Sequence, residues 1–227
     1  MATKRILRDI SELETKLYSD LGIYYVADEK NIHKGFGCIF GPKDTPYEDC
    51  PMLFSFDIGT DFPFNPPKVL FRTYDGITRF HPNMYKEGKV CLSILGTWEG
   101  PSWTSSSKLS SILVTLQSLM DSDPILHEPG YKLPSQEMKE GYAKYVEHAC
   151  IQYILERAEK SVQPDAFLVF QEIYKQRLPE ILLRLESRLL SLVKEEKTFI
   201  NLPYQLFGKT NYSNLLQRVI KLKAISN

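Results

Sequence analysis

Long apolar runs, an excess of charge of either sign and closely spaced cysteines are all missing from this sequence of 227 residues. No stretch approaches the ~18 uncharged apolar residues of a membrane span, so no membrane association is expected. Lys and Arg together number 28, as do Asp and Glu, so the charge balance predicts no nucleic-acid partner either. Charged side chains interrupt the N-terminal segment, which lacks the apolar core of a secretion signal. We therefore expect an intracellular protein, in the cytoplasm, the nucleus or both.

Metal-ligand and nucleotide-binding patterns are missing as well. The four cysteines and four histidines form no pair with ligand spacing, so no metal site is expected. In an intracellular protein without a CxxC pair, we expect the cysteines to be free thiols. The sequence has no glycine-rich phosphate loop of the Walker type. The chain is therefore not expected to consume ATP or to need a cofactor.

The apolar pattern changes character along the chain. Residues 6–17 repeat apolar side chains at helical spacing, whereas residues 24–80 hold short apolar segments between turn-rich clusters. Residues 81–107 look irregular, and a loop of this length in a compact domain is uncommon unless it is functional. Helical spacing returns at 109–120 and dominates from residue 135 onward. The sequence thus predicts an α+β fold with an N-terminal helix, a four-stranded antiparallel meander and C-terminal helices. The expected strands cover residues 24–26, 36–40, 53–58 and 68–71.

Cys91 occupies a position where the core does not need a cysteine. Val90, Leu92 and Ile94 alternate around it, so a short extended segment would bury these three side chains on one face. Cys91 would then point the other way, shortly after the tripeptide His81–Asn83. The pattern indicates a reactive thiol rather than a packing one.

Four motifs around this cysteine resemble the ubiquitin-conjugating enzymes in order, spacing and flanking strands, over about residues 3–155. They are Gly41–Glu48 (GPKDTPYE), Pro63–Val69 (PFNPPKV), His81–Asn83 (HPN) and Gly88–Leu95 (GKVCLSIL). The segment Val90–Trp103, with Gln117–Met120 and Glu128–Gly130, is similar to the Z-type class of these enzymes, and Asn211–Arg218 resembles that class's C-terminal extension. The resemblance implies a ubiquitin-conjugating core over residues 1–156. A helical extension over 157–227 would pack on or beside it.

The same resemblance implies an acyl-transfer function for Cys91. Its thiol would accept ubiquitin, or a ubiquitin-like modifier, from an activating enzyme as a thioester, and pass it to a lysine or to a ligase cysteine. Asn83 would stabilise the oxyanion formed during attack on the thioester, or only brace the loop, and the two roles could coexist. The family position of His81 implies a structural role in holding the loop.

The acceptor lysine must lose a proton before it attacks, and a carboxylate near the site could assist. Conjugating enzymes of the ordinary type have an Asp or Ser before a proline in the loop after the second helix, and this sequence departs from that pattern. Glu128, which precedes Pro129, is the candidate replacement, with Asp121 and Asp123 as weaker ones. Each could instead be a solvated charge or a helix-end residue.

Two partner surfaces follow from the family positions. Lys4, Arg5 and Arg8 match the helix face that meets the activating enzyme, although a row of charges is usually a solvated face. Phe64 and the loop tip Pro101–Ser102 correspond to the two loops that contact a ligase, and an exposed aromatic suits such a contact. Protein substrates complete the expected partners.

Two other functions remain open from the sequence. A ubiquitin-binding variant without catalysis would normally have lost its cysteine, so Cys91 argues against it. A thiol hydrolase built on Cys91 and His81 would need the imidazole within about 2.6–3.2 Å of the sulfur. An imidazole turned into the loop would exclude the hydrolase.

Overall fold

Two short helices precede the sheet. The computed structural model describes residues 2–131, 133–159 and 168–226. Helices α1 (Ala2–Leu13) and α2 (Lys16–Asp20) occupy the region where the sequence predicted one helix. After them the chain turns at Gly22, whose φ of 75° lies in the left-handed region that glycine adopts without strain.

The central sheet is the predicted antiparallel meander. Its strands are β1 (Ile23–Ala27), β2 (Lys34–Phe40), β3 (Pro51–Asp57) and β4 (Lys68–Phe71). They pair in the order β1-β2-β3-β4, each antiparallel to the next. Helix α3 (Leu109–Leu119) packs closely on β2, because a Cβ added at Gly37 would lie only 2.8 Å from Leu113 Cδ2. The α+β prediction is therefore confirmed, with the core between α3 and the sheet.

The segment between β4 and α3 is irregular, as the sequence predicted for residues 81–107. It contains isolated bridges, such as Leu70 with Lys89 and Met84 with Val90, and one short 3-10 helix, η1 (Ser93–Leu95). After α3 follow two more 3-10 turns, η2 (Pro124–His127) and η3 (Pro129–Tyr131).

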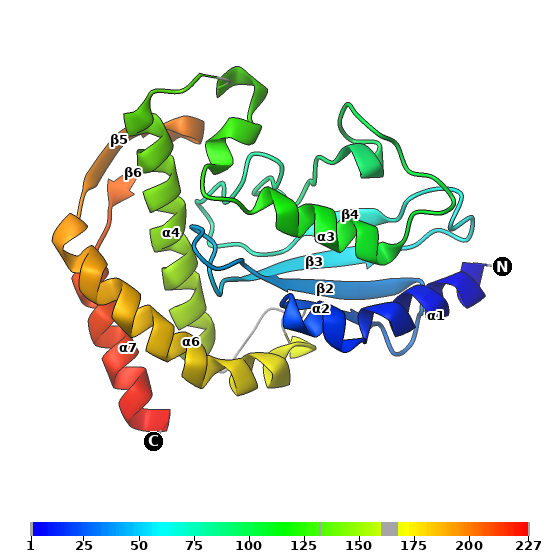
Figure 1. Cartoon of the computed structure of the whole chain (residues 1–227), viewed down its shortest axis with the longest axis horizontal. Helices are drawn as coiled ribbons and strands as arrows, with labels where there is room; N and C mark the ends of the chain where they lie inside the picture. Colours follow the sequence, from blue (N-terminus) through cyan, green and yellow to red (C-terminus); the bar gives the residue numbers. More distant parts are fainter. Residues whose placement is uncertain (1, 132, 160–167, 227) are drawn as a thin grey trace.

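Helix α4 (Gln136–Glu159) stands at one end of the sheet, between the sheet and the C-terminal part of the chain (Figure 1). It runs through residue 156 without interruption, so the backbone has no break at the predicted domain boundary. The division into a core over 1–156 and an extension over 157–227 stays a prediction, and residues 160–167 of that extension lie outside the described residues.

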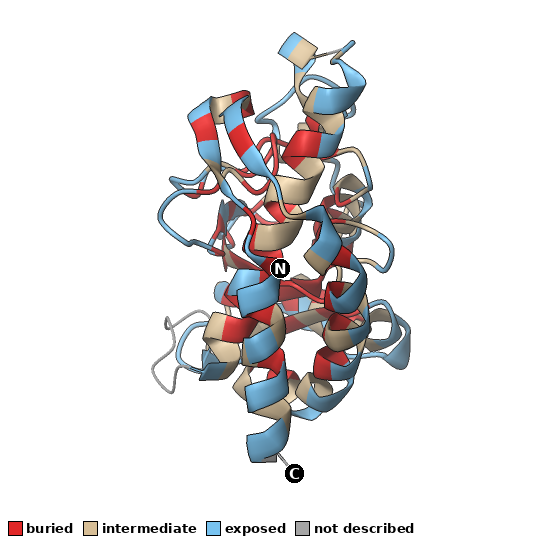
Figure 2. Cartoon of the chain, turned by 90° about the vertical axis from the view of Figure 1, so that its left-hand side faces the viewer, coloured by how far each residue is buried: buried red, intermediate tan, exposed pale blue. Residues whose placement is uncertain are grey.

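The described part of the extension, residues 168–226, contains helices α6 and α7 and an unpredicted β-hairpin. Its elements are α6 (Gln171–Leu192), η4 (Val193–Glu195), β5 (Thr198–Leu202), η5 (Pro203–Gln205), β6 (Leu206–Lys209) and α7 (Tyr212–Ser226). Helices α6 and α7 confirm that the extension is largely helical, whereas the β5–β6 sheet was missed. Figure 2 shows this side of the molecule, with buried positions along the faces that the helices turn inward. None of the helices in the described ranges has both the length and the apolar character that crossing a membrane requires.

Arginines of α6 fasten the extension to the core. Arg184 donates two hydrogen bonds of 2.8 Å to the two carboxylate oxygens of Asp49, which is almost fully buried. Arg188 pairs with Glu147 of α4 at 2.5 Å and lies 3.6 Å from Glu48. Asp49, Arg188 and Glu147 have little access to solvent, whereas the Arg184 side chain is 39% exposed. The contacts fix α6 against both the β2–β3 connection and α4.

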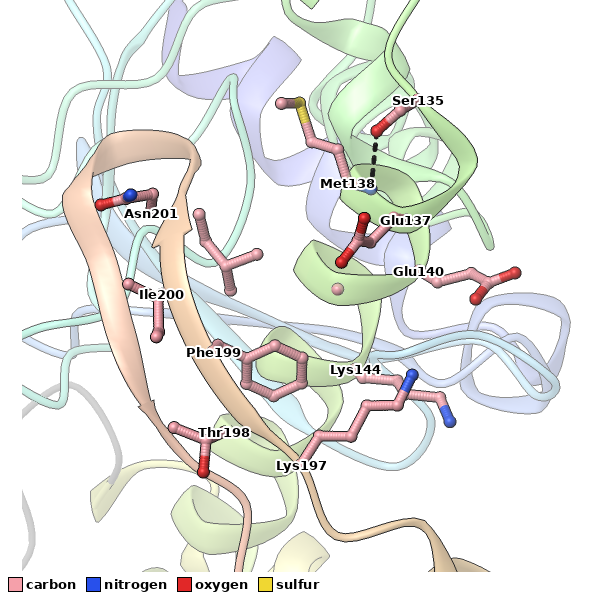
Figure 3. Close-up of a pocket in the computed structure, with 12 residues that line it drawn as sticks. Ser135, Glu137, Met138, Glu140, Lys144, Lys197, Thr198, Phe199, Ile200 and Asn201 are labelled. Atoms are coloured by element: carbon pink, nitrogen blue, oxygen red, sulfur yellow. Dashed lines mark hydrogen bonds between the residues drawn. The ribbon is translucent and has the colours of Figure 1, made fainter.

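The hairpin packs against the first turns of α4. Gly141 permits the close approach, because a Cβ there would lie 2.9 Å from Leu202 Cδ2. Next to it, the rings of Tyr145 and Phe199 meet edge to face with centroids 6.2 Å apart. Figure 3 shows the pocket between these elements, with Lys144 and Lys197 at one end. The hairpin is thus seated on α4 and directs its tip toward the loops beyond the N-terminus of that helix.

Candidate active site

Cys91 lies in the irregular segment just before η1. Its N–H donates to Asn83 O at 2.9 Å, and its own carbonyl accepts from Asn83 Nδ2 at 2.7 Å. Cys91 is outside the contiguous apolar cluster that Val90 and Leu92 join. The side chain is nevertheless only 2% exposed, which the sequence did not predict.

The predicted extended segment around Cys91 is only partly correct. Val90 and Leu92 are buried as expected, but Ile94 belongs to η1 and is half-buried, so the alternation ends at Leu92. The other three cysteines, Cys38, Cys50 and Cys150, lie inside the core as free thiols. Burial raises the pKa of both the Cys38 and the Cys50 thiol.

Thr97 holds the residues on both sides of Cys91. Its hydroxyl lies 2.8 Å from Val90 O and accepts the Leu92 N–H at 2.9 Å. The turn that returns the chain to this position uses Gly96 with a φ of 68°. Sequence reasoning gave Thr97 no role, because nothing local shows that its side chain folds back on the cysteine.

His81 is turned into the loop and is fully buried. Its Nδ1 accepts the Asn83 N–H at 3.0 Å, so the proton is on Nε2, which donates to Leu119 O at 3.0 Å. Burial lowers the pKa of His81 to about 3, so the ring is neutral at physiological pH. Both nitrogens are engaged, which leaves neither to accept a proton from Cys91 and excludes the thiol hydrolase.

Asn83 is 8% exposed and is held against the cysteine by the two hydrogen bonds given above. Its Oδ1 is buried and has no hydrogen-bond partner among the described residues. In this structure the side chain braces the loop. Because an amide nitrogen has two hydrogens, one remains for a second acceptor. The oxyanion role of Asn83 therefore stays a prediction that the geometry permits.

The three carboxylates expected on the acceptor side have different partners. Asp121 accepts from His127 Nε2 at 2.8 Å, Asp123 pairs with Lys139 at 3.3 Å, and Glu128 accepts from the Tyr204 hydroxyl at 2.7 Å.

His127 connects this side to the loop of the cysteine. Its ring centroid lies 5.0 Å from that of His81. It also lines an open groove of about 780 Å³, between residues 96–99, which follow Cys91, and residues 126–129. Nothing in the sequence near His127 indicates this placement, in which its side chain is 27% exposed.

The predicted partner residues fall into two groups. On α1, Lys4 and Arg8 are exposed, but Arg5 is engaged within the chain: it donates to Asp9 at 2.7 Å and to Ser105 O at 2.8 Å. Its guanidinium ties α1 to the end of the active-site loop, so Arg5 is less available to a partner than its neighbours.

The two predicted ligase loops lie together. Phe64 is 66% exposed, and Pro101 and Ser102 are also exposed. Trp103 Nε1 donates to Pro63 O at 2.7 Å and so joins the loop tips. Among the described residues, no group of three or more His, Cys, Asp and Glu side chains is arranged to hold a metal ion.

Comparisons with known proteins agree with this geometry. A family model described as ubiquitin-conjugating enzyme matches residues 5–152. Ubiquitin-conjugating enzyme E2 Z of Xenopus tropicalis is 41% identical over 71% of this chain and 52% of that protein, and the human protein of this name is 43% identical over 62% and 38%. The chain thus spans about half or less of the length of these relatives. Among solved structures, an E2 domain of a Toxoplasma gondii ubiquitin conjugating enzyme is 26% identical, with a TM-score of 0.50 over 67% of this chain and 96% of that domain.

Proposed function

The chain belongs to the ubiquitin-conjugating enzyme family, and on this premise we propose that Cys91 carries ubiquitin, or a ubiquitin-like modifier, as a thioester. The thiolate attacks the modifier's carboxyl carbon on the activating enzyme, a new C–S bond forms, and the activating enzyme's thiolate leaves. One observation carries the proposal: Cys91, although buried, is not a member of the contiguous apolar cluster and lies in a segment whose backbone is fixed by Asn83 and Thr97. A thiol held in this way, in a member of this family, suits a carrier that must present one acyl group repeatedly.

Transfer to lysine is the second step. The lysine nitrogen attacks the thioester carbon, the negative charge moves to the carbonyl oxygen, and collapse breaks the C–S bond and releases the Cys91 thiolate. Asn83 Nδ2 donates its free hydrogen to that oxygen while the other remains on Cys91 O. With a ligase cysteine as acceptor, the product is a second thioester instead of an amide.

For the acceptor side we propose Asp121, acting through His127. Nε2–H of His127 donates to Asp121, so Nδ1 carries the lone pair, and the ring lines the groove next to the cysteine loop. The attacking amine gives a proton to this nitrogen as the amide forms. Asp123 and Glu128 are bonded to Lys139 and Tyr204, which supports indirect roles for both.

For the partner surfaces, the proposal follows the family positions named in the sequence. We propose that the exposed Lys4 and Arg8, with Arg5 supporting the helix from within, meet the activating enzyme. Phe64 and Pro101–Ser102 meet a ligase. Protein substrates present their lysines to the groove beside His127.

The test is a loading assay with the full chain, an activating enzyme, ubiquitin and ATP, analysed on non-reducing gels. A band heavier by one ubiquitin and sensitive to thiol is expected. Cys91→Ala should abolish it, and Cys91→Ser should give a thiol-resistant oxyester. Cys150→Ala, which removes a buried thiol of the core, serves as the matched control.

Loading that survives Cys91→Ala would refute the carrier role. No loading with any activating enzyme and either class of modifier would favour the variant that binds ubiquitin without catalysis.

A further inference from the structure

The turn of the β5–β6 hairpin holds non-glycine residues in an unfavourable backbone conformation. Tyr204 and Gln205 in this turn have φ values of 62° and 59°, and Asn201 near the end of β5 has a φ of 58°, all in the left-handed region. This conformation is strained for Tyr and Gln, because it brings the Cβ close to a backbone carbonyl oxygen, whereas Asn adopts it more readily. Contacts made by the side chains of this turn must therefore hold it in place.

Tyr204 makes contacts of this kind. The guanidinium carbon of Arg79 lies 4.9 Å from the centre of its ring, and the same guanidinium lies 3.3 Å from the centre of the Tyr85 ring. The Tyr204 hydroxyl donates to Glu128 Oε2 at 2.7 Å, and its ring meets that of Tyr142 edge to face at 5.8 Å. A hairpin of the extension thus contacts two separate loops of the core.

Both loops border the site of Cys91. Arg79 Nε donates to His81 O at 3.1 Å, and its NH2 group donates to Pro82 O at 2.5 Å. These carbonyls belong to the tripeptide that ends in Asn83. Glu128 directly follows His127, which lines the groove beside the cysteine loop. Through Tyr204 the extension therefore contacts both the arginine that binds the His81 and Pro82 carbonyls and the residue next to His127.

We propose that Tyr204 is a positioning residue of the transfer step. Through Arg79 it fixes the loop that carries Asn83, and through Glu128 it fixes the loop that carries His127. The extension is thereby part of the active-site structure. The inference rests on the proposed function for its consequence in transfer, and on the contacts alone for its consequence in loop order.

The experiment compares Tyr204→Ala, Tyr204→Phe and Phe207→Ala in the full chain. Phe207 is 76% exposed on the same hairpin and makes no contact with Arg79 or Glu128 among the interactions described, so it is the matched control. Loaded protein is isolated, and its discharge to free lysine is followed over a range of lysine concentrations.

Tyr204→Ala should slow discharge by roughly tenfold or more, mainly through the limiting rate, while loading changes less than about twofold. Tyr204→Phe keeps the ring over Arg79 and loses only the bond to Glu128, so it should fall between Tyr204→Ala and the unmodified chain. The proposal would be overturned if Tyr204→Ala and Tyr204→Phe discharged at the same rate as Phe207→Ala and the unmodified chain. Equal loss of loading and discharge would reduce Tyr204 to a folding role.

A second measurement does not depend on ubiquitin. Alkylation of Cys91 by iodoacetamide should be several-fold faster in Tyr204→Ala, because a loosened loop exposes a thiol that is now 2% exposed. The Phe207→Ala rate should equal that of the unmodified chain. If the unmodified chain does not load, the proposed function fails, and the alkylation rates still decide on Tyr204: an unchanged rate overturns the inference.

Discussion

Replacing Asn83 by alanine distinguishes the two roles of its side chain, because the two roles predict effects of different size. As a brace, the amide contributes one hydrogen bond to Cys91 O, which is worth about 1 kcal/mol in unfolding free energy. Its buried Oδ1 has no partner among the described residues, so losing that atom removes no further bond. As an oxyanion donor, the same group is worth about 10²–10³ in rate, or roughly 3–4 kcal/mol of transition-state stabilisation. We expect the larger effect on discharge and the smaller one on stability.

The assay is a single-turnover discharge. The chain is loaded, further loading is stopped by removing ATP, and decay of the thioester in added lysine is followed on non-reducing gels. Asn83→Ala should slow this decay by about 10²–10³ while the loading rate stays within a few-fold. Unfolding in urea should report a loss of about 1 kcal/mol.

Thr97→Val is the matched control, because Thr97 braces the same segment but offers no amide to the substrate. It should lower stability by at least as much as Asn83→Ala and slow discharge far less. Equal slowing of discharge by the two variants, or an equal loss in loading and discharge for Asn83→Ala, would show that Asn83 only holds the loop.

Three further predictions concern stability and partner binding. The pKa of His81 in the folded chain is about 3, below the ordinary value near 6.5, so the unfolded state binds more protons between these values. The contribution of His81 to the free energy of unfolding should therefore be fully present above pH ~6.5 and fall by up to about 1.4 kcal/mol per pH unit toward pH 3. His81→Asn should reduce this slope, as measured by urea unfolding at several pH values. Arg188→Ala removes the cation that pairs with the poorly solvated Glu147 carboxylate, and should lower the free energy of unfolding by about 3 kcal/mol. A loss below about 1 kcal/mol would contradict the pairing. Reversing the charges of Lys4 and Arg8 should slow loading about tenfold at low salt and less at high salt, with unchanged thermal stability, and an effect independent of salt would count against an electrostatic contact.

The sequence predicted what depends on neighbouring residues. Asn83 and Cys91 lie in one short loop, so a motif fixes their contact, and the meander follows from alternating segments with turns between them. Burial of Cys91 was not predicted, since the extended pattern ends at Leu92, just before η1, and the Thr97 side chain returns to Val90 and Leu92. The single predicted N-terminal helix is two helices, and no proline or glycine marks the break near Thr15.

The missed features depend on contacts between distant parts of the chain. The turn between β5 and β6 lacks the Asn-Gly or Asp-Gly pair that usually reveals a hairpin. Tyr204, a residue that does not signal a turn, takes the left-handed conformation there instead. Nothing near Glu128 or Arg79 indicates that a tyrosine from the extension will contact both. The pairing of Asp121 with His127 likewise requires the 3-10 turn η2, which the sequence did not reveal.

Helix α4 has a consequence for how the molecule unfolds. Tyr153 of this helix is buried in the core, whereas Glu147 of the same helix is bound by Arg188 of the extension. An intermediate with the extension detached would leave the Glu147 carboxylate without its arginine, and one with the core melted would leave the extension without its support. Neither intermediate is favourable, so the two parts should lose structure together, in one cooperative transition with the same midpoint for every probe.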